Sequence, residues 1–132
     1  MIELPAILTR FAINTRDVVP ELASQHIGLE PSRVLKKGEP RTPPRPPVAE
    51  SSWMIESPRR HLYSLDESMT QVLNIVWPKR REITSFCNKH NLQCLFVTVV
   101  WADAEHRPIY ELSRQSFKKI SALHASWIMD LV

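Results

Sequence analysis

Apolar and polar residues alternate along the first strongly patterned segment of the chain, residues 6–14. An extended backbone places Ile7, Phe11 and Ile13 on one side of this segment. Arg10 and Asn14 then lie on the other side. A period of two residues is typical of a strand that is buried on one face, so we predict a strand over 6–14.

A short amphipathic helix is predicted to begin at Pro20, because proline at the first helical position has no N–H to lose. Its apolar stripe is formed by Leu22, Ala23 and Ile27. Gly28 stands where a left-handed cap requires a residue without Cβ, and Pro31 prevents the helix from continuing. We therefore assign structural roles to Gly28 and Pro31.

Residues 30–50 show neither a helical nor a strand period and hold six of the eleven prolines. Prolines favour extended geometry and remove backbone donors. Loops of this length inside a compact domain are usually functional or disordered. We predict an exposed proline-rich loop, and its candidate binding residues are Arg33, Lys36, Lys37, Gly38, Arg41 and Arg45.

The middle of the chain predicts one strand and two helices. Residues 52–56 form the strand, with Trp53 as a structural core residue. Ser64 begins a capping-box sequence, followed by the apolar spacing of a helix up to Val76. Trp77-Pro78 interrupts the helix. A second helical piece then covers residues 79–90.

The last third predicts a strand at 92–101 with apolar residues on both faces, as in an interior strand of a sheet. A short returning strand is expected at 109–112. Ser113 then starts a third helix, whose inward residues are Phe117, Ile120 and Leu123. The closing strand alternates from Trp127 onward.

The predicted order is β-α-β-α-β-β-α-β within a single α+β domain, residues 1–132. We expect an antiparallel or mixed sheet with helices packed on it. The order is reminiscent of the split β-α-β arrangement of ferredoxin-like domains.

Composition agrees with an ordinary globular domain, since 43% of the residues are hydrophobic and 23% are charged. No apolar window is long enough to span a membrane, and the first residues lack the features of a signal peptide. We therefore expect a cytoplasmic protein with no membrane partner. A formal charge of +3 permits nucleic-acid contact without requiring it.

Cysteine and histidine spacing offers one weak metal motif, Cys87, His90 and Cys94. A fourth ligand would have to come from His61, His106 or His124. The simpler interpretation is that both cysteines are packing residues and that His90 lies at a helix end. We therefore predict no metal site.

Catalytic motifs are not evident, because the two glycines allow neither a nucleophile elbow nor a phosphate-binding loop. We expect no catalytic residues, no cofactor and no enzymatic activity. Basic groups at 33–37, 41–45, 59–60 and 79–81 leave nucleic-acid binding as the alternative function, with Trp53 or Tyr63 as a stacking platform.

Several short motifs resemble the bacterial domain-of-unknown-function family 4279. They are Phe11-x-Ile13, Pro20-Glu21, Ile27-Gly28-Leu29-x-Pro31, Lys37-Gly38, Trp53, Leu112-Ser113 and Ile120-x-x-Leu123. The chain departs from that pattern at His124, where glycine is expected, and in the proline-rich insert 41–47. The resemblance implies an α+β domain with no established activity and no catalytic residues to carry over.

We therefore predict a non-catalytic binding domain with an unidentified protein partner, in which the 30–50 loop makes the contact. The resemblance also suggests immunity-type binding of a protein, because some small domains of this kind accompany toxins.

Overall fold

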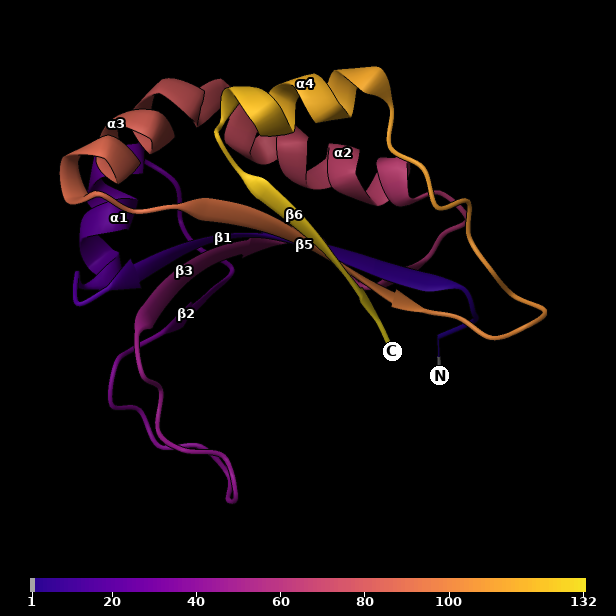
Figure 1. Cartoon of the computed structure of the whole chain (residues 1–132), viewed down its shortest axis with the longest axis horizontal. Helices are drawn as coiled ribbons and strands as arrows, with labels where there is room; N and C mark the ends of the chain where they lie inside the picture. Colours follow the sequence, from indigo (N-terminus) through magenta and orange to yellow (C-terminus); the bar gives the residue numbers. More distant parts are fainter. Residues whose placement is uncertain (1) are drawn as a thin grey trace.

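The computed structural model describes residues 2–132 and shows a six-stranded mixed sheet with all four α-helices on one of its faces (Figure 1). The strands are β1 Ala6–Arg16, β2 Arg33–Leu35, β3 Ser51–Glu56, β4 Arg60–His61, β5 Cys94–Trp101 and β6 Ser126–Leu131. The helices are α1 Pro20–Ile27, α2 Leu65–Val76, α3 Arg80–His90 and α4 Arg114–Ala122, with the 3-10 turn η1 at Trp77–Lys79. The order in the sheet is β2-β3-β1-β5-β6, and β4 pairs with β1.

Strand directions confirm the mixed sheet but not the ferredoxin-like order. β1 is antiparallel to both β3 and β5, while β5 and β6 are parallel and adjacent. A split β-α-β unit needs a third strand between its parallel pair. Here α1 leads into a β2–β3 hairpin that returns antiparallel to β1, so that arrangement does not form.

Most predicted elements are confirmed. β1 covers the predicted strand and continues to Arg16, and α1 begins at Pro20 and is capped by Gly28 at φ 80°. Ser64 caps α2 by accepting a hydrogen bond from the Glu67 amide at 3.1 Å. β5 has a neighbour on each side, as its two apolar faces predicted.

Five expectations about the elements were wrong. Leu22, predicted in the apolar stripe of α1, is 43% exposed, because helical spacing alone does not show how much of the helix the core covers. Residues 33–35 form β2 inside the predicted loop, because three residues are too few to show a period. The two-residue β4 was missed for the same reason. Residues 109–112 do not form a strand; Ile109 makes an isolated bridge to Ser64. Phe117 is exposed and lies edge-on against Trp127 instead of pointing inward.

The core lies between the sheet and the helices and is centred on aromatic residues. Phe11 packs against Phe96 at 5.0 Å and against Trp53 at 6.5 Å between ring centroids. All three side chains are fully buried. The Trp53 indole also donates a hydrogen bond to Ser24 Oγ at 3.0 Å, which ties β3 to α1. The single core thus holds all its helices to one face.

Candidate functional site

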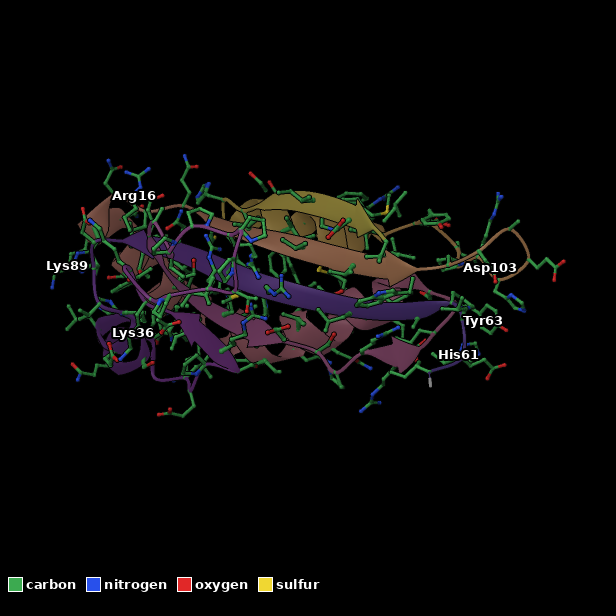
Figure 2. The ribbon with its side chains drawn as sticks, turned by 90° about the horizontal axis from the view of Figure 1, so that it is seen from below. Arg16, Lys36, His61, Tyr63, Lys89 and Asp103 are labelled. Atoms are coloured by element: carbon green, nitrogen blue, oxygen red, sulfur yellow. The ribbon has the colours of Figure 1, made fainter. Side chains whose placement is uncertain are left out.

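The second face of the sheet carries no helix. Successive strand residues point to opposite sides, so half of the sheet's side chains face away from the helical layer. Figure 2 looks onto this side, and no helix crosses in front of the strands. The register places these residues on the helix-free face: Leu8, Arg10, Ala12, Asn14, Arg33, Leu35, Ser52, Met54, Glu56, Leu95, Val97, Val99, Trp101, Ser126, Ile128 and Asp130.

Arg10 and Glu56 form an ion pair within this mostly apolar face. Arg10 Nη2 lies 3.3 Å from Glu56 Oε2, and only 25% and 16% of the two side chains are exposed. Arg10 Nε is buried and has no hydrogen-bond partner among the described residues. The guanidinium therefore uses only part of its five donors on Glu56. Because Nε is buried, an external acceptor can reach only the Nη groups, for which residues 2–132 show a single hydrogen bond, from Nη2 to Glu56.

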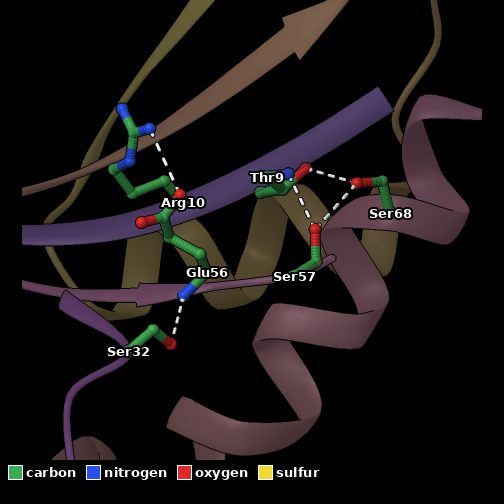
Figure 3. Close-up of polar contacts among 6 residues, drawn as sticks. All are labelled: Thr9, Arg10, Ser32, Glu56, Ser57 and Ser68. Carbon is green, nitrogen blue, oxygen red and sulfur yellow. Dashed lines mark hydrogen bonds and ion pairs between the residues drawn. The ribbon is translucent and has the colours of Figure 1, made fainter. Parts of the chain in front are cut away.

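The orientation of β1 is held from its other side by buried hydroxyl groups. The Thr9 amide donates to Ser57 Oγ at 2.8 Å, and Thr9 Oγ1 lies 2.8 Å from Ser68 Oγ on α2. Figure 3 shows this cluster on the helical side, while the neighbouring Arg10 points to Glu56 on the other side. Because a strand alternates its side chains, the Thr9 contacts also fix the outward direction of Arg10.

A β-bulge lies at the far end of β1. The register with β3 shifts between Asn14 and Arg16, and Arg16 has a left-handed φ of 54°. A hollow of about 230 Å³ opens beside the bulge and is lined by Asn14, Arg16, Gln93, Cys94, Leu95, Ser126 and Ile128. Bulges re-aim side chains and are enriched next to binding sites. The helix-free face therefore ends in a hollow with polar and apolar walls.

Glu50 joins this hollow to the root of the proline-rich loop. Its carboxylate accepts a hydrogen bond from Asn14 Nδ2 at 3.2 Å and lies 3.9 Å from Arg16 Nε. The loop thus begins at the edge of the helix-free face. In Figure 1 the loop between β2 and β3 extends away from the helices, on the helix-free side of the sheet.

The proline-rich loop is held by its own hydrogen bonds. Gly38 donates its amide to the Val48 carbonyl at 2.8 Å, and Val48 donates to Glu39 at 2.9 Å. Arg41 Nε donates to the Pro46 carbonyl at 2.8 Å, and the Val48 side chain is buried. The loop therefore extends the β2–β3 hairpin, and backbone hydrogen bonds join its two sides where it leaves the hairpin. We call this segment, residues 36–50, the proline-rich arm.

The candidate binding residues of the loop do not form one basic surface. Lys36 Nζ lies 2.8 Å from Glu21 Oε1 on α1, and Lys37 pairs with Asp17 in the turn between β1 and α1. These hydrogen bonds raise the pKa of each lysine and lower the pKa of each carboxyl group. Gly38 and Arg41 shape the loop, as described above. Arg33 and Arg45 are exposed and make no salt bridge within residues 2–132.

The cysteine and histidine motif is divided by the fold. Cys87 and Cys94 are buried in contact with each other, and Cys94 donates to the Leu123 carbonyl at 3.4 Å. His90 instead packs on Phe86, with ring centroids 4.8 Å apart. Within residues 2–132 no three His, Cys, Asp or Glu side chains are grouped to hold a metal ion.

Arg10, Glu56 and Glu50 were missed as site residues by the sequence. A charged residue on the outer face of a predicted strand is normally assigned to solvent. The sequence feature that could have indicated this pair is that Arg10 and Glu56 carry opposite charges and that each lies on the less apolar face of a predicted strand. That signal requires the register of β1 against β3, which no local pattern supplies.

The part of the chain that the structure describes has no helix with the length and apolar character of a membrane span. A model of the family described as "Domain of unknown function (DUF4279)" matches residues 6–131. No curated protein and no solved structure matches the chain.

Proposed function

The chain belongs to the DUF4279 family of domains of unknown function, and we propose that it is a non-catalytic binding domain whose partner protein docks on the helix-free face. The observation that carries the proposal is the Arg10–Glu56 pair, which lies within an apolar sheet face and leaves arginine donors unused.

The composition of the helix-free face supports a protein partner. Interface cores are depleted in charge and enriched in methionine and arginine. Between Arg33 on β2 and Asp130 on β6, the face carries aliphatic side chains around one ion pair, and Met54, which is 4% exposed, lies beside that pair on β3. A carbonyl or carboxylate oxygen of the partner would bind the free N–H groups of Arg10. Apolar contact around that bond would exclude water and strengthen it.

The proline-rich arm supports the same proposal through its position. Glu50 fixes the root of the arm to the end of β1, and the arm projects on the side from which the helices are absent (Figure 1). A partner seated on the helix-free face would therefore also contact the arm. The loop predicted to make the contact therefore keeps that role in this proposal, as one side of a larger binding site on the helix-free face.

A photo-crosslinking amino acid at Val97 tests the proposal, because Val97 lies directly opposite Arg10 in the sheet. The matched control carries the same amino acid at Thr70, which is exposed on α2. In cells that produce the protein, we expect a crosslinked adduct with a partner protein from position 97 but not from position 70.

A double variant then tests the ion pair itself. Arg10→Met with Glu56→Gln removes both charges together, keeps the length of the Glu56 side chain and leaves no unpaired charge. We expect it to fold and to reduce the adduct yield at least about tenfold, since buried arginine contacts are frequent hot spots. Equal adducts from both positions, or an adduct that the double variant leaves unchanged, would refute the proposal.

Nucleic-acid binding is the second candidate, and a hollow in the helical layer favours it. The hollow measures about 370 Å³ and is lined by Arg80, Arg81, Thr84, Ser85, Asn88 and Ala122. Arginine with hydroxyl and amide donors suits phosphate oxygens. Retention on heparin at low salt, reduced in Arg81→Ala and lost as salt rises, would support this candidate. No retention at low salt would exclude it.

A further inference from the structure

β6 is an edge strand with exposed apolar side chains on both of its faces. It pairs with β5 on one side, and no strand lies on its other side within residues 2–132. Leu131 is 62% exposed and Ile128 is 50% exposed, and Met129 is also exposed. Asp130 is the one charged residue of the strand. Long apolar edge strands pair readily with another chain unless charge, proline or a bulge prevents it.

The opposite edge of the sheet has the protection that β6 lacks. β2 is only three residues long, it begins with the exposed Arg33, and it leads directly into the proline-rich arm. Short length and charge are the usual devices that prevent strand addition. Of the two edges, only β6 is therefore suited to extend the sheet.

The backbone of β6 shows which groups are free to pair. The Val132 amide donates to the Val100 carbonyl of β5 at 2.9 Å, so the even-numbered residues of this strand direct their amides toward β5. Successive residues alternate direction, and the N–H and C=O groups of Trp127, Met129 and Leu131 therefore point away from β5. The free N–H and C=O groups of these three residues can therefore form a ladder of backbone hydrogen bonds with another strand.

We propose that a second copy of this chain occupies that ladder, with β6 antiparallel to its symmetry mate across a two-fold axis at Met129. In this register Met129 faces Met129 of the second copy, and Trp127 faces Leu131. All three outward residues then exchange backbone hydrogen bonds. Their apolar side chains meet on the helical side, where the exposed Phe117 packs on Trp127 and extends the contact.

The two neighbouring registers of β6 against its symmetry mate are less favourable than the one centred on Met129. A shift toward the N-terminal end centres the axis on Ile128 and brings Leu131 opposite Ala125. The Ala125 amide is already donated to the Ile120 carbonyl at 3.1 Å. A shift the other way places the two Asp130 carboxylates opposite each other, and like charges there are destabilising. Charge and hydrogen bonding thus favour the same two-fold register.

The dimer would join two sheets into one and place two helix-free faces side by side. An isologous contact of this kind closes on itself, so it ends at two copies instead of forming a fibre. The pairing needs no partner protein. The dimer proposal is therefore independent of the proposed binding function, and each can be true without the other.

Sedimentation velocity over micromolar to submillimolar concentrations tests the dimer. We expect the full chain to change from monomer to dimer as its concentration rises. Met129→Lys places two ammonium groups opposite each other and should raise the dimer dissociation constant at least about tenfold. The matched control, Leu22→Lys, changes an exposed apolar residue of α1 and should leave the constant unchanged. A protein that stays monomeric throughout, or a dimer that both variants affect equally, would overturn the proposal.

A cysteine pair tests the register. Directly opposite residues in an antiparallel ladder lie about 5.5 Å apart between Cα atoms, within reach of a short bifunctional thiol-reactive crosslinker. Met129→Cys should therefore crosslink to its copy. Leu131→Cys should not, because its copy lies about four residues, or about 13 Å, along the ladder. Crosslinking of Leu131→Cys as efficient as that of Met129→Cys would overturn the register.

Discussion

The Asp66 carboxylate on α2 accepts a hydrogen bond of 2.6 Å from the Ser116 hydroxyl on α4 and a second one of 2.9 Å from the Ser113 amide. The Asp66 side chain thereby links the N-terminal ends of α2 and α4. Asp66→Ala leaves the amide and the hydroxyl without this acceptor, and we expect it to lower the free energy of unfolding by about 1–3 kcal/mol. Thr70→Ala on the exposed side of α2 should change it by less than about 0.5 kcal/mol. Urea unfolding of both variants measures the difference, and equal values would contradict the role of Asp66.

The same carboxylate predicts a pH dependence. Burial raises the pKa of Asp66, but the hydrogen bonds from Ser116 and Ser113 outweigh it and bring the pKa below its ordinary value of 3.8. Because the pKa of Asp66 is lower in the folded state, its carboxylate contributes fully to the free energy of unfolding above the ordinary pKa. That contribution is lost as the pH falls through the pKa of the folded state. Asp66→Asn should therefore show a shallower loss of stability below about pH 4 than the parent chain. Parallel acid-side slopes for the two proteins would contradict this prediction.

Trp53 should contribute both packing and a hydrogen bond. Trp53→Phe removes the indole N–H that binds Ser24 and leaves a small cavity, so we expect a loss of about 1–3 kcal/mol in the free energy of unfolding. Ser24→Ala leaves the buried indole donor unsatisfied and should cost about 1 kcal/mol. In a double-mutant cycle the two losses should not add, because they share one hydrogen bond. Additive losses would show that the hydrogen bond contributes nothing.

His124 follows α4 with a left-handed φ of 55°, at the position where the family resemblance leads us to expect glycine. A Cβ in this conformation costs about 1 kcal/mol. His124→Gly should therefore raise the thermal midpoint, with a gain of up to about 1 kcal/mol. Gly28→Ala is the converse change at φ 80°, and its Cβ would lie 3.2 Å from Lys79 Nζ, so it should destabilise the protein. A His124→Gly variant that loses stability would show that the imidazole makes a needed contact.

Thiol reactivity gives a further prediction. The hydrogen bond with Cys87 and burial raise the pKa of Cys94, and its S–H is donated to the Leu123 carbonyl. Only the thiolate reacts readily, so Cys94 should resist maleimide labelling in the folded protein at neutral pH. Labelling in urea should become rapid. Mass spectrometry of tryptic peptides distinguishes Cys94 from Cys87, and fast native labelling of Cys94 would contradict the buried pair.

The sequence predicted most elements because each has a local cause. Pro20 and Gly28 mark the two ends of α1, Ser64 caps α2, and apolar alternation defines β1 and β5. Phe117 shows where such patterns stop, since helical spacing alone cannot tell whether an aromatic residue faces the core or the neighbouring Trp127. The ion pairs of Lys36 with Glu21 and of Lys37 with Asp17 also depend on residues distant in the chain, so no local pattern could show that these two lysines have acidic partners.

The sequence by itself therefore determined the α+β class, the helix ends and the buried faces, because capping and periodicity act over a few residues. The tertiary structure alone decided the strand order, the helix-free face, the Arg10–Glu56 pair and the exposed edge at β6. Each of these depends on which strands become neighbours and in which register. A register is set by contacts across the whole sheet, and no single segment contains that information.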